Sequence, residues 1–240
     1  MVNIESILCG SSYARSLLSE VETLYGEKLL LKVEPNLGGQ LSVKPWIPFP
    51  IIFYKEENLL NEGDCVHELF HLKLIKQGCP YAILKDKNEN NNWRPQIPDM
   101  LSNLFQHSLF FPELIKHNYS PYEMEEKGLE NQLDVIQNNK ISISQDLSFN
   151  EYLSYCISLQ AVLSLVYART ILECKSAKLA DRSESLFSMD NFQRQKRIGE
   201  RLITIIKKHA VEDFSIYKVG IVEAIELLDQ TNFIKIEAAA

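Results

Sequence analysis

Cysteine is scarce in this 240-residue sequence, which has five cysteines without paired close spacing. An odd number of this kind excludes a regular disulfide framework and a four-thiolate zinc site, and it fits a reducing compartment. The apolar fraction of 45% is ordinary for a protein with a packed core. We therefore expect a cytoplasmic globular protein that folds without disulfides.

Positive charge is also limited. The sequence has 25 lysines and arginines against 32 acidic residues, which gives a formal net charge of −7 at pH 7. This balance argues against a nucleic acid or an anionic membrane surface as the main partner. Basic residues concentrate only between residues 196 and 208, where we interpret them as the solvated face of a helix. The sequence does not fix the oligomeric state.

No segment has the uninterrupted apolar character of a membrane span or an export signal. Glu5 stands where an export signal would need a basic start and an apolar core. The segment from Tyr152 to Ala168 has no charge, but it contains the polar residues Ser154, Ser158, Gln160 and Ser164. We interpret it as a buried helix of a bundle, and we expect no membrane partner.

The first part of the chain predicts two helices and three strands, in the order helix, strand, edge strand, strand, helix. They cover residues 11–26, 28–34, 40–44 and 51–54, and the second helix follows a cap at Asn58 or Asn61. Three prolines follow the second strand closely, and proline is tolerated at a sheet edge rather than at its centre. This strand can therefore receive an extended peptide.

The rest of the chain is predicted to be mainly helical. A helix over residues 99–111 precedes Pro112, at which we expect a new short segment to begin. Three long segments then carry apolar residues at helical spacing, over residues 149–175, 191–208 and 213–230. The sequence thus predicts an α+β fold with a core over residues 1–120 and a helical region over residues 121–240.

Residues 67–71 read His-Glu-Leu-Phe-His, the pattern H-E-x-x-H, in an apolar helix-forming run. On a helix His67 and His71 lie one turn apart on the same face, so both imidazoles can bind one metal ion. Glu68 lies about 100° round the helix from His67, where its carboxylate can act as general base on a metal-bound water. The alternative is a pair of buried core histidines, because this helix is apolar almost all round.

A catalytic zinc ion usually has three protein ligands and one open position for water. Asp99, Asn103 and His107 lie at i, i+4 steps and form one stripe on the next predicted helix. Either Asp99 or His107 can supply the third ligand, and about 12 Å of helix rise separates the two. Tyr119 and Tyr122 follow, and a tyrosine hydroxyl is a plausible donor to an oxyanion.

The segment from Asp99 to Pro112 resembles the zinc-binding segment of the ImmA/IrrE-type peptidases, written roughly as E-x-x-A-N-x-F-A-x-x-L-L-M-P. The matching positions are Asn103, Phe105, Leu109 and Pro112. The resemblance places the family's metal-binding glutamate on Asp99, and the gap after His71 (99 − 71 = 28) is similar. It covers roughly residues 26–119 and implies a zincin-type HExxH zinc metallopeptidase.

Together these patterns predict a zinc-dependent endopeptidase that cleaves a protein or peptide substrate. The substrate would lie extended along the predicted edge strand, formed by Gln40, Leu41, Ser42, Val43 and Lys44, and would pair with it through main-chain atoms. By analogy with the resembled family, the substrate is expected to be a specific regulatory protein. The alternative is an inactive, metal-stabilised scaffold whose helical region binds a partner or acts as a sensor.

Overall fold

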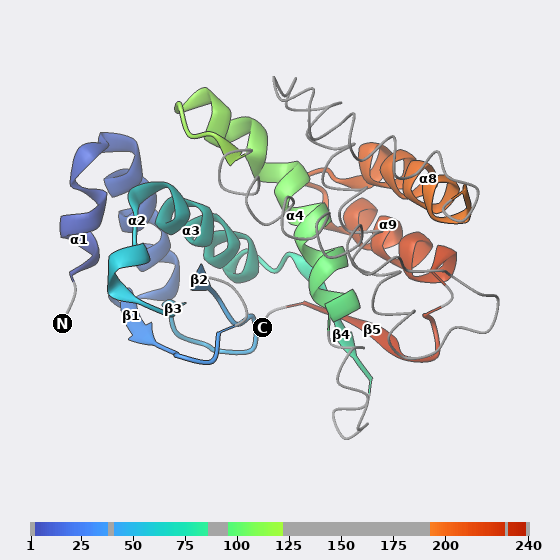
Figure 1. The fold of residues 1–240 in the computed structure, drawn as a ribbon, viewed down its shortest axis with the longest axis horizontal. Coiled ribbons are helices and arrows are strands. Elements are labelled where there is room, and N and C mark those ends of the chain that lie inside the picture. Colours follow the sequence, from blue (N-terminus) through green and yellow to red (C-terminus); the bar gives the residue numbers. More distant parts are fainter. Residues whose placement is uncertain (1–2, 38–40, 86–95, 122–192, 229, 239–240) are drawn as a thin grey trace, which may run out of the picture. The chain divides into compact units, whose positions relative to one another are not determined.

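The computed structural model describes residues 3–37, 41–85, 96–121, 193–228 and 230–238, which form an α+β fold, as predicted (Figure 1). The chain divides into two compact units. The first unit comprises Met1–Pro80, Glu113–Ser120 and Ala238–Ala240, and the second comprises Tyr81–Pro112 and Pro121–Glu237. The predicted boundary between residues 120 and 121 stays a prediction.

The first unit contains helices, a small sheet and a further helix in the predicted order. Its elements are α1 (Ile4–Ile7), η1 (Leu8–Gly10), α2 (Ser12–Tyr25), β1 (Leu30–Val33), β2 (Leu41–Ser42), β3 (Ile51–Tyr54), η2 (Glu57–Leu59) and α3 (Glu62–Lys76). The HExxH segment lies in α3, because the strand that precedes it ends at Tyr54 and Asn61 caps the new helix. The last turn of α4 also belongs to this unit.

The sheet of the first unit has the order β1-β3-β2. β1 runs parallel to β3, with Leu30 opposite Ile51, and β2 runs antiparallel to β3, with Leu41 opposite Tyr54. β2 is therefore an edge strand, as predicted. It is shorter than predicted because it pairs only at Leu41 and Ser42, and the prolines that follow lack the N–H that a longer ladder needs.

Helices α2 and α3 pack against each other in the first unit. Ser11 caps α2 through its hydroxyl, and Gly26 ends it with a left-handed φ of 70°. The Tyr25 hydroxyl donates a hydrogen bond to the carbonyl of Leu72 at 3.2 Å. The two helices are therefore held together by a hydrogen bond as well as by the packing of their apolar faces.

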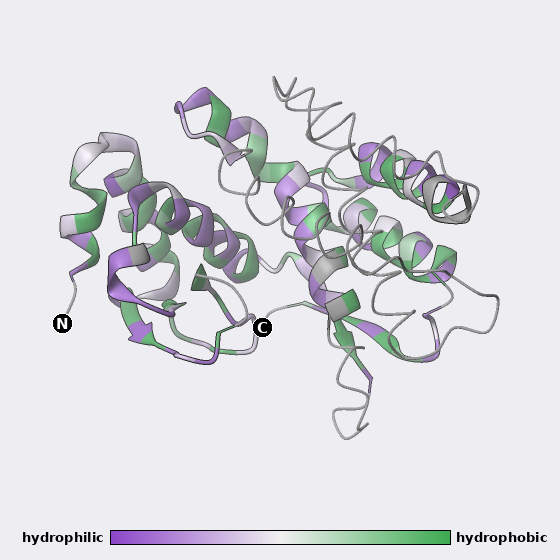
Figure 2. Ribbon diagram, in the orientation of Figure 1, coloured by the Kyte–Doolittle hydropathy of each residue, from purple (hydrophilic) through white to green (hydrophobic). Residues whose placement is uncertain are grey.

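The described part of the second unit contains a two-stranded sheet and a helical pair. Its elements are β4 (Pro80–Leu84), α4 (Gln96–Lys116), α8 (Gln193–His209), α9 (Phe214–Leu227) and β5 (Ile234–Ala238). β4 and β5 pair with each other, and α8 packs against α9. Figure 2 shows polar and apolar residues alternating along α8, as expected for a helix with one buried face. The predicted helix over residues 149–175 lies outside the described residues.

Helix α4 continues through Pro112, so the predicted end at Phe111 is wrong. Pro112 has no N–H to donate to the carbonyl of Ser108, yet the helix runs on to Lys116. Its end is set by Asn118, which has a left-handed φ of 65°. The N–H groups of Asn118 and Tyr119 donate to the carbonyls of Ile115 and Leu114 at 3.0 Å each, which is the Schellman arrangement of a helix end.

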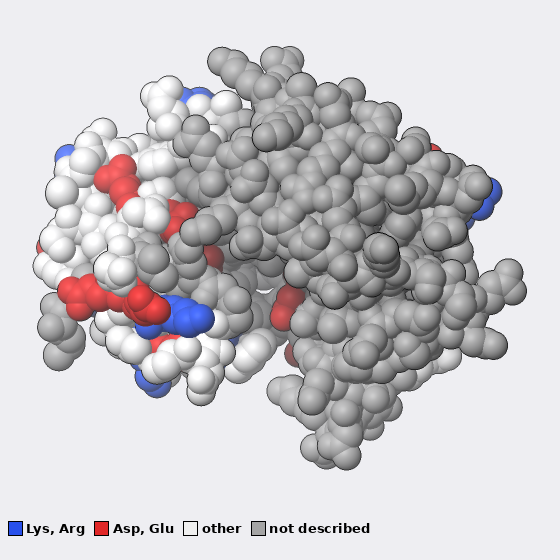
Figure 3. Space-filling model, in the orientation of Figure 1, with Lys and Arg blue, Asp and Glu red and all other residues white. Residues whose placement is uncertain are grey.

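The surface view in Figure 3 shows acidic side chains in separate groups over the described residues of the first unit, with a basic group beside one of them. No broad basic patch is visible on that face among the described residues. None of the helices that the structure describes combines the length and the apolar character that crossing a bilayer requires.

Candidate metal centre

Helix α3 holds the HExxH residues on a firmly packed scaffold. The Asn61 side chain accepts a hydrogen bond from the N–H of Asp64 at 2.9 Å. Two acidic residues in the first turn stabilise the helix through their interaction with the positive end of its dipole. Val66, Leu69 and Leu72 are buried with at most 2% of their surface exposed. The backbone that carries the two histidines is therefore fixed by packing on several sides.

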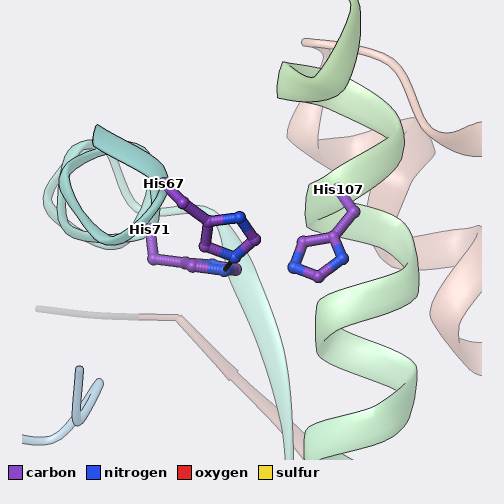
Figure 4. Close-up of side chains that lie close together, drawn as sticks. All are labelled: His67, His71 and His107. Atoms are coloured by element: carbon purple, nitrogen blue, oxygen red, sulfur yellow. Dashed lines mark hydrogen bonds between the residues drawn. The ribbon is translucent and has the colours of Figure 1, made fainter. Parts of the chain in front are cut away.

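His67 and His71 point their ring nitrogens at each other. Their Nε2 atoms lie 3.0 Å apart, and the ring centroids are separated by 4.9 Å (Figure 4). Which of the two Nε2 atoms donates in this contact depends on the tautomers of the rings. Two imidazoles on a tetrahedral zinc ion, at Zn–N distances of about 2.05 Å, place their nitrogens about 3.3 Å apart. The pair is therefore within a few tenths of an ångström of a zinc-binding geometry.

Burial keeps the imidazole of His67 uncharged. The pKa of His67 is well below its ordinary value of 6.5, first because the surrounding protein removes water and second because His71 adds an unfavourable charge when protonated. The ring retains some accessible surface, but the packing round it is dense enough to disfavour the cation. Neutral imidazole is the form that binds a metal, so His67 needs to lose no proton before it can bind one.

His107 brings a third imidazole to this pair. The nearest ligand atoms of His67, His71 and His107 all lie within 4.8 Å of one another, and the three rings converge in Figure 4. Among the described residues these three form a group that can hold a metal ion. The His107 ring stacks on Phe111 at a centroid distance of 4.5 Å, which fixes its orientation on α4.

Glu68 follows His67 directly in α3 and is half-buried. Burial, followed by the charges of Asp64 and Glu68, raises the pKa of the Cys65 thiol to about 12. Cys65 is fully buried, so it stays a neutral packing residue rather than a thiolate ligand.

Asp99 is not in the three-histidine group, although it is a described residue of α4. Its side chain retains accessible surface, while partial desolvation by neighbouring atoms raises the pKa of the carboxyl to about 6. Asn103 is exposed. The helical stripe predicted from Asp99 to His107 is present in α4, and only its His107 end joins the cluster.

The edge strand lies against α3 in the first unit. Leu41, Ser42, Val43 and Lys44 are half-buried, and Gln40 lies outside the described residues. Lys44 pairs with Glu34 at 2.7 Å and lies 4.4 Å from the ring centroid of Phe53. The charge of Lys44 is therefore already engaged within the sheet.

The structure places the Tyr119 hydroxyl on Glu62, to which it donates a hydrogen bond at 2.8 Å. Tyr122 lies outside the described residues. Their assignment as oxyanion donors stays a prediction. The sequence analysis did not single out Glu62. Its only local signal is its place as an acidic residue in the first turn of α3. Nothing in the sequence near Glu62 links it to Tyr119, which lies 57 residues away.

Comparison of the chain with known protein families, with curated proteins and with solved structures finds no match. The likeness of the segment from Asp99 to Pro112 to the ImmA/IrrE-type peptidases therefore remains a resemblance of individual residues. A metal site is supported by the geometry of His67, His71 and His107 alone.

Proposed function

We propose that this chain is a zinc-dependent peptidase in which His67, His71 and His107 bind the metal and Glu68 acts as general base. The observation that carries the proposal is the convergence of three imidazoles, two of them with Nε2 atoms 3.0 Å apart on one helix turn. A chance pair of core histidines explains the two rings on α3, but it gives no reason for a third ring to meet them.

The donor set fits zinc. Three neutral imidazoles are common zinc ligands, and three protein ligands leave a fourth position open. A zinc ion bound there supplies Lewis acidity and lowers the pKa of water in that position toward neutrality. This proposal selects His107 over Asp99 as the third ligand, because Asp99 is about two turns of helix away and is absent from the cluster.

Glu68 and the edge strand supply the other parts of the proposed reaction. Glu68 follows His67 directly in α3, so its carboxylate can accept a proton from water beside the imidazole pair. β2 lies against α3 and has a free edge in the three-stranded sheet that the structure describes. An extended segment of a protein, which the family resemblance suggests is a specific regulatory protein, would pair with that edge through its main chain.

Metal analysis tests the first half of the proposal. The purified chain is expected to contain one zinc ion, and His67→Ala, His71→Ala and His107→Ala are each expected to reduce zinc content after dialysis against a weak chelator. Asp99→Asn serves as the matched control, since it changes the competing candidate ligand on the same helix as His107. Zinc loss in Asp99→Asn with retention in His107→Ala would reverse the assignment of the third ligand.

Cleavage of a fluorogenic peptide library and of unfolded casein tests the second half. Glu68→Gln is expected to keep zinc and to lose at least about 100-fold in activity, as removal of a general base does. Asp64→Asn, an acid on the same helix, should leave activity unchanged. A zinc-bound wild type that cleaves neither probe nor any protein in a cell extract would instead support the inactive scaffold.

A further inference from the structure

The connection between β2 and β3 presents a tryptophan to solvent. Trp46 is 62% exposed, the highest fraction among the large apolar side chains of the described residues. Phe49, three residues later in the same connection, is 46% exposed. A tryptophan buries a large apolar area when it is covered, whereas Trp46 leaves most of its surface in water and adds little to the core. Packing within the chain therefore does not explain an indole at this position.

Prolines hold the backbone of this connection. Three of them interleave with the two aromatic residues over residues 45–50. Each proline fixes its own φ and restricts the residue before it. The N–H of Ile47 donates to the carbonyl of Lys44 at 3.0 Å, which closes a turn with Trp46 at one of its two central positions. Trp46 thus projects from a backbone with few alternative conformations, and such preorganisation lowers the entropy that is lost on binding.

The end of the sheet where this connection enters β3 is apolar. The N–H of Leu30, the first residue of β1, donates to the carbonyl of Pro50 at 2.9 Å, and Leu30 lies opposite Ile51 in β3. Leu30 is 56% exposed. Phe49 precedes Pro50 directly, so Leu30 and Phe49 lie at the same end of the sheet.

The one charged residue in the β2 edge and its connection is already paired. Lys44 is the only charged residue between residues 41 and 50. Its Nζ lies 3.0 and 2.7 Å from the two carboxylate oxygens of Glu34, and 4.4 Å from the ring centroid of Phe53. Residues 41–50 therefore offer no unpaired charge to a ligand, which favours an apolar side chain over an acidic or a basic one.

Trp46 lies a short way along the chain from the free edge of β2. It follows Ser42, the last residue of β2, by four residues (46 − 42), so the two lie within about 14 Å even if the chain between them is extended. β2 contacts α3, which carries His67 and Glu68, and all of these residues belong to the first unit. An extended segment paired with β2 therefore reaches Trp46 within about four residues.

We propose that Trp46 is a specificity-determining residue, which binds a large apolar side chain of the extended substrate segment that pairs with β2. The inference rests on the proposed peptidase function and names the class of segment that the site accepts. Main-chain pairing along a sheet edge gives affinity, and side-chain contacts beside the edge give specificity. Trp46 supplies such a contact for leucine, methionine or phenylalanine, whereas a charged side chain would lose water there without gaining a partner.

Cleavage by the zinc-bound full chain tests this preference. The probe is a series of short fluorogenic peptides of alanine, serine and threonine in which one phenylalanine is moved along the sequence, and a matched series carries aspartate instead. The wild type is expected to cleave at least one phenylalanine peptide with a kcat/KM about tenfold above that of its aspartate counterpart. Trp46→Ala should raise the KM for that peptide about tenfold and leave kcat unchanged, because it removes a binding contact rather than a catalytic group.

Val33→Ala is the matched control, because Val33 is 52% exposed on β1, at the other edge of the same sheet. Its KM for every peptide should equal that of the wild type. Trp46→Ala removes an exposed side chain, so its unfolding midpoint should match that of the wild type, and a change in KM then reflects lost binding rather than a lost fold. An equal preference for phenylalanine in Trp46→Ala and in the wild type would overturn the proposal.

Binding without cleavage separates this inference from the proposed function. The anisotropy of fluorescein-labelled peptides of both series, measured with purified Glu68→Gln, should give a dissociation constant about tenfold lower for the phenylalanine peptide. Adding Trp46→Ala should abolish that difference. A chain that cleaves no peptide, but binds the phenylalanine peptide through Trp46, defeats the peptidase and keeps the binding role. A chain that cleaves both series equally defeats only the role of Trp46, and a chain that neither cleaves nor binds either series defeats both.

Discussion

The Nε2 atoms of His67 and His71 face each other at 3.0 Å across one turn of α3. An i, i+4 spacing brings two side chains to one helix face, and here the two ring centroids lie 4.9 Å apart. His71 is 6% exposed, so its ring is held by the surrounding core. Burial of polar nitrogens disfavours folding unless they have a partner, and the contact between the two rings supplies one.

We predict that zinc stabilises the folded chain. A ligand whose free concentration is 100 times its dissociation constant adds about 2.7 kcal/mol to the free energy of unfolding. Chemical unfolding of metal-free protein, with and without zinc, measures this difference. His71→Ala is expected to remove most of the zinc-dependent increase. An equal increase in His71→Ala would show that the stabilising ion binds elsewhere.

We predict that Tyr25 makes the protein less stable at high pH. Burial raises the pKa of Tyr25 from 10.0 to about 12 in the folded state. The unfolded chain therefore loses its proton first, so the stabilising contribution is complete below pH 10 and falls as the pH rises toward 12. Urea unfolding between pH 9 and 11.5 checks this. The slope should be shallower in Tyr25→Phe; identical slopes in the two proteins would contradict the prediction.

We predict that Gly220→Ala destabilises the second unit, although alanine is the better helix former by about 1 kcal/mol. A Cβ atom at position 220 would collide with the Cβ of His209 and would lie 2.8 Å from the Phe105 ring. Overpacking of this kind typically costs about 2 kcal/mol in free energy of unfolding. Thermal unfolding measures the loss. Val219→Ala is the control, because Val219 is 49% exposed and its change should be within about 0.5 kcal/mol.

We predict that Asn61→Ala weakens the start of the metal-binding helix. Its side-chain oxygen accepts the N–H of Asp64 at 2.9 Å, and loss of such a cap typically costs about 1 kcal/mol. Asn61→Asp keeps an acceptor and should retain most of the stability. Denaturant unfolding of the three proteins gives the comparison, and equal midpoints for Asn61→Ala and the wild type would show that the cap contributes little.

The sequence by itself determined those features whose causes lie within a few residues. The order of the elements up to α3 follows from hydrophobic period and capping residues, so it was predicted correctly. The pairing of His67 with His71 follows from helix geometry. A local rule failed at Pro112, where α4 continues to Lys116. Burial of the neighbouring Phe111 and Leu114 favours the helix there, and its end comes only near Asn118.

Only the tertiary structure decided which distant residues meet. His107 joins the histidine pair while Asp99, which the sequence resemblance favoured as the metal ligand, is absent from the cluster. Glu62 meets Tyr119 and Gly10 through contacts that no pattern along the chain encodes. Such contacts depend on how whole helices pack, and packing sums many weak interactions between residues far apart in sequence.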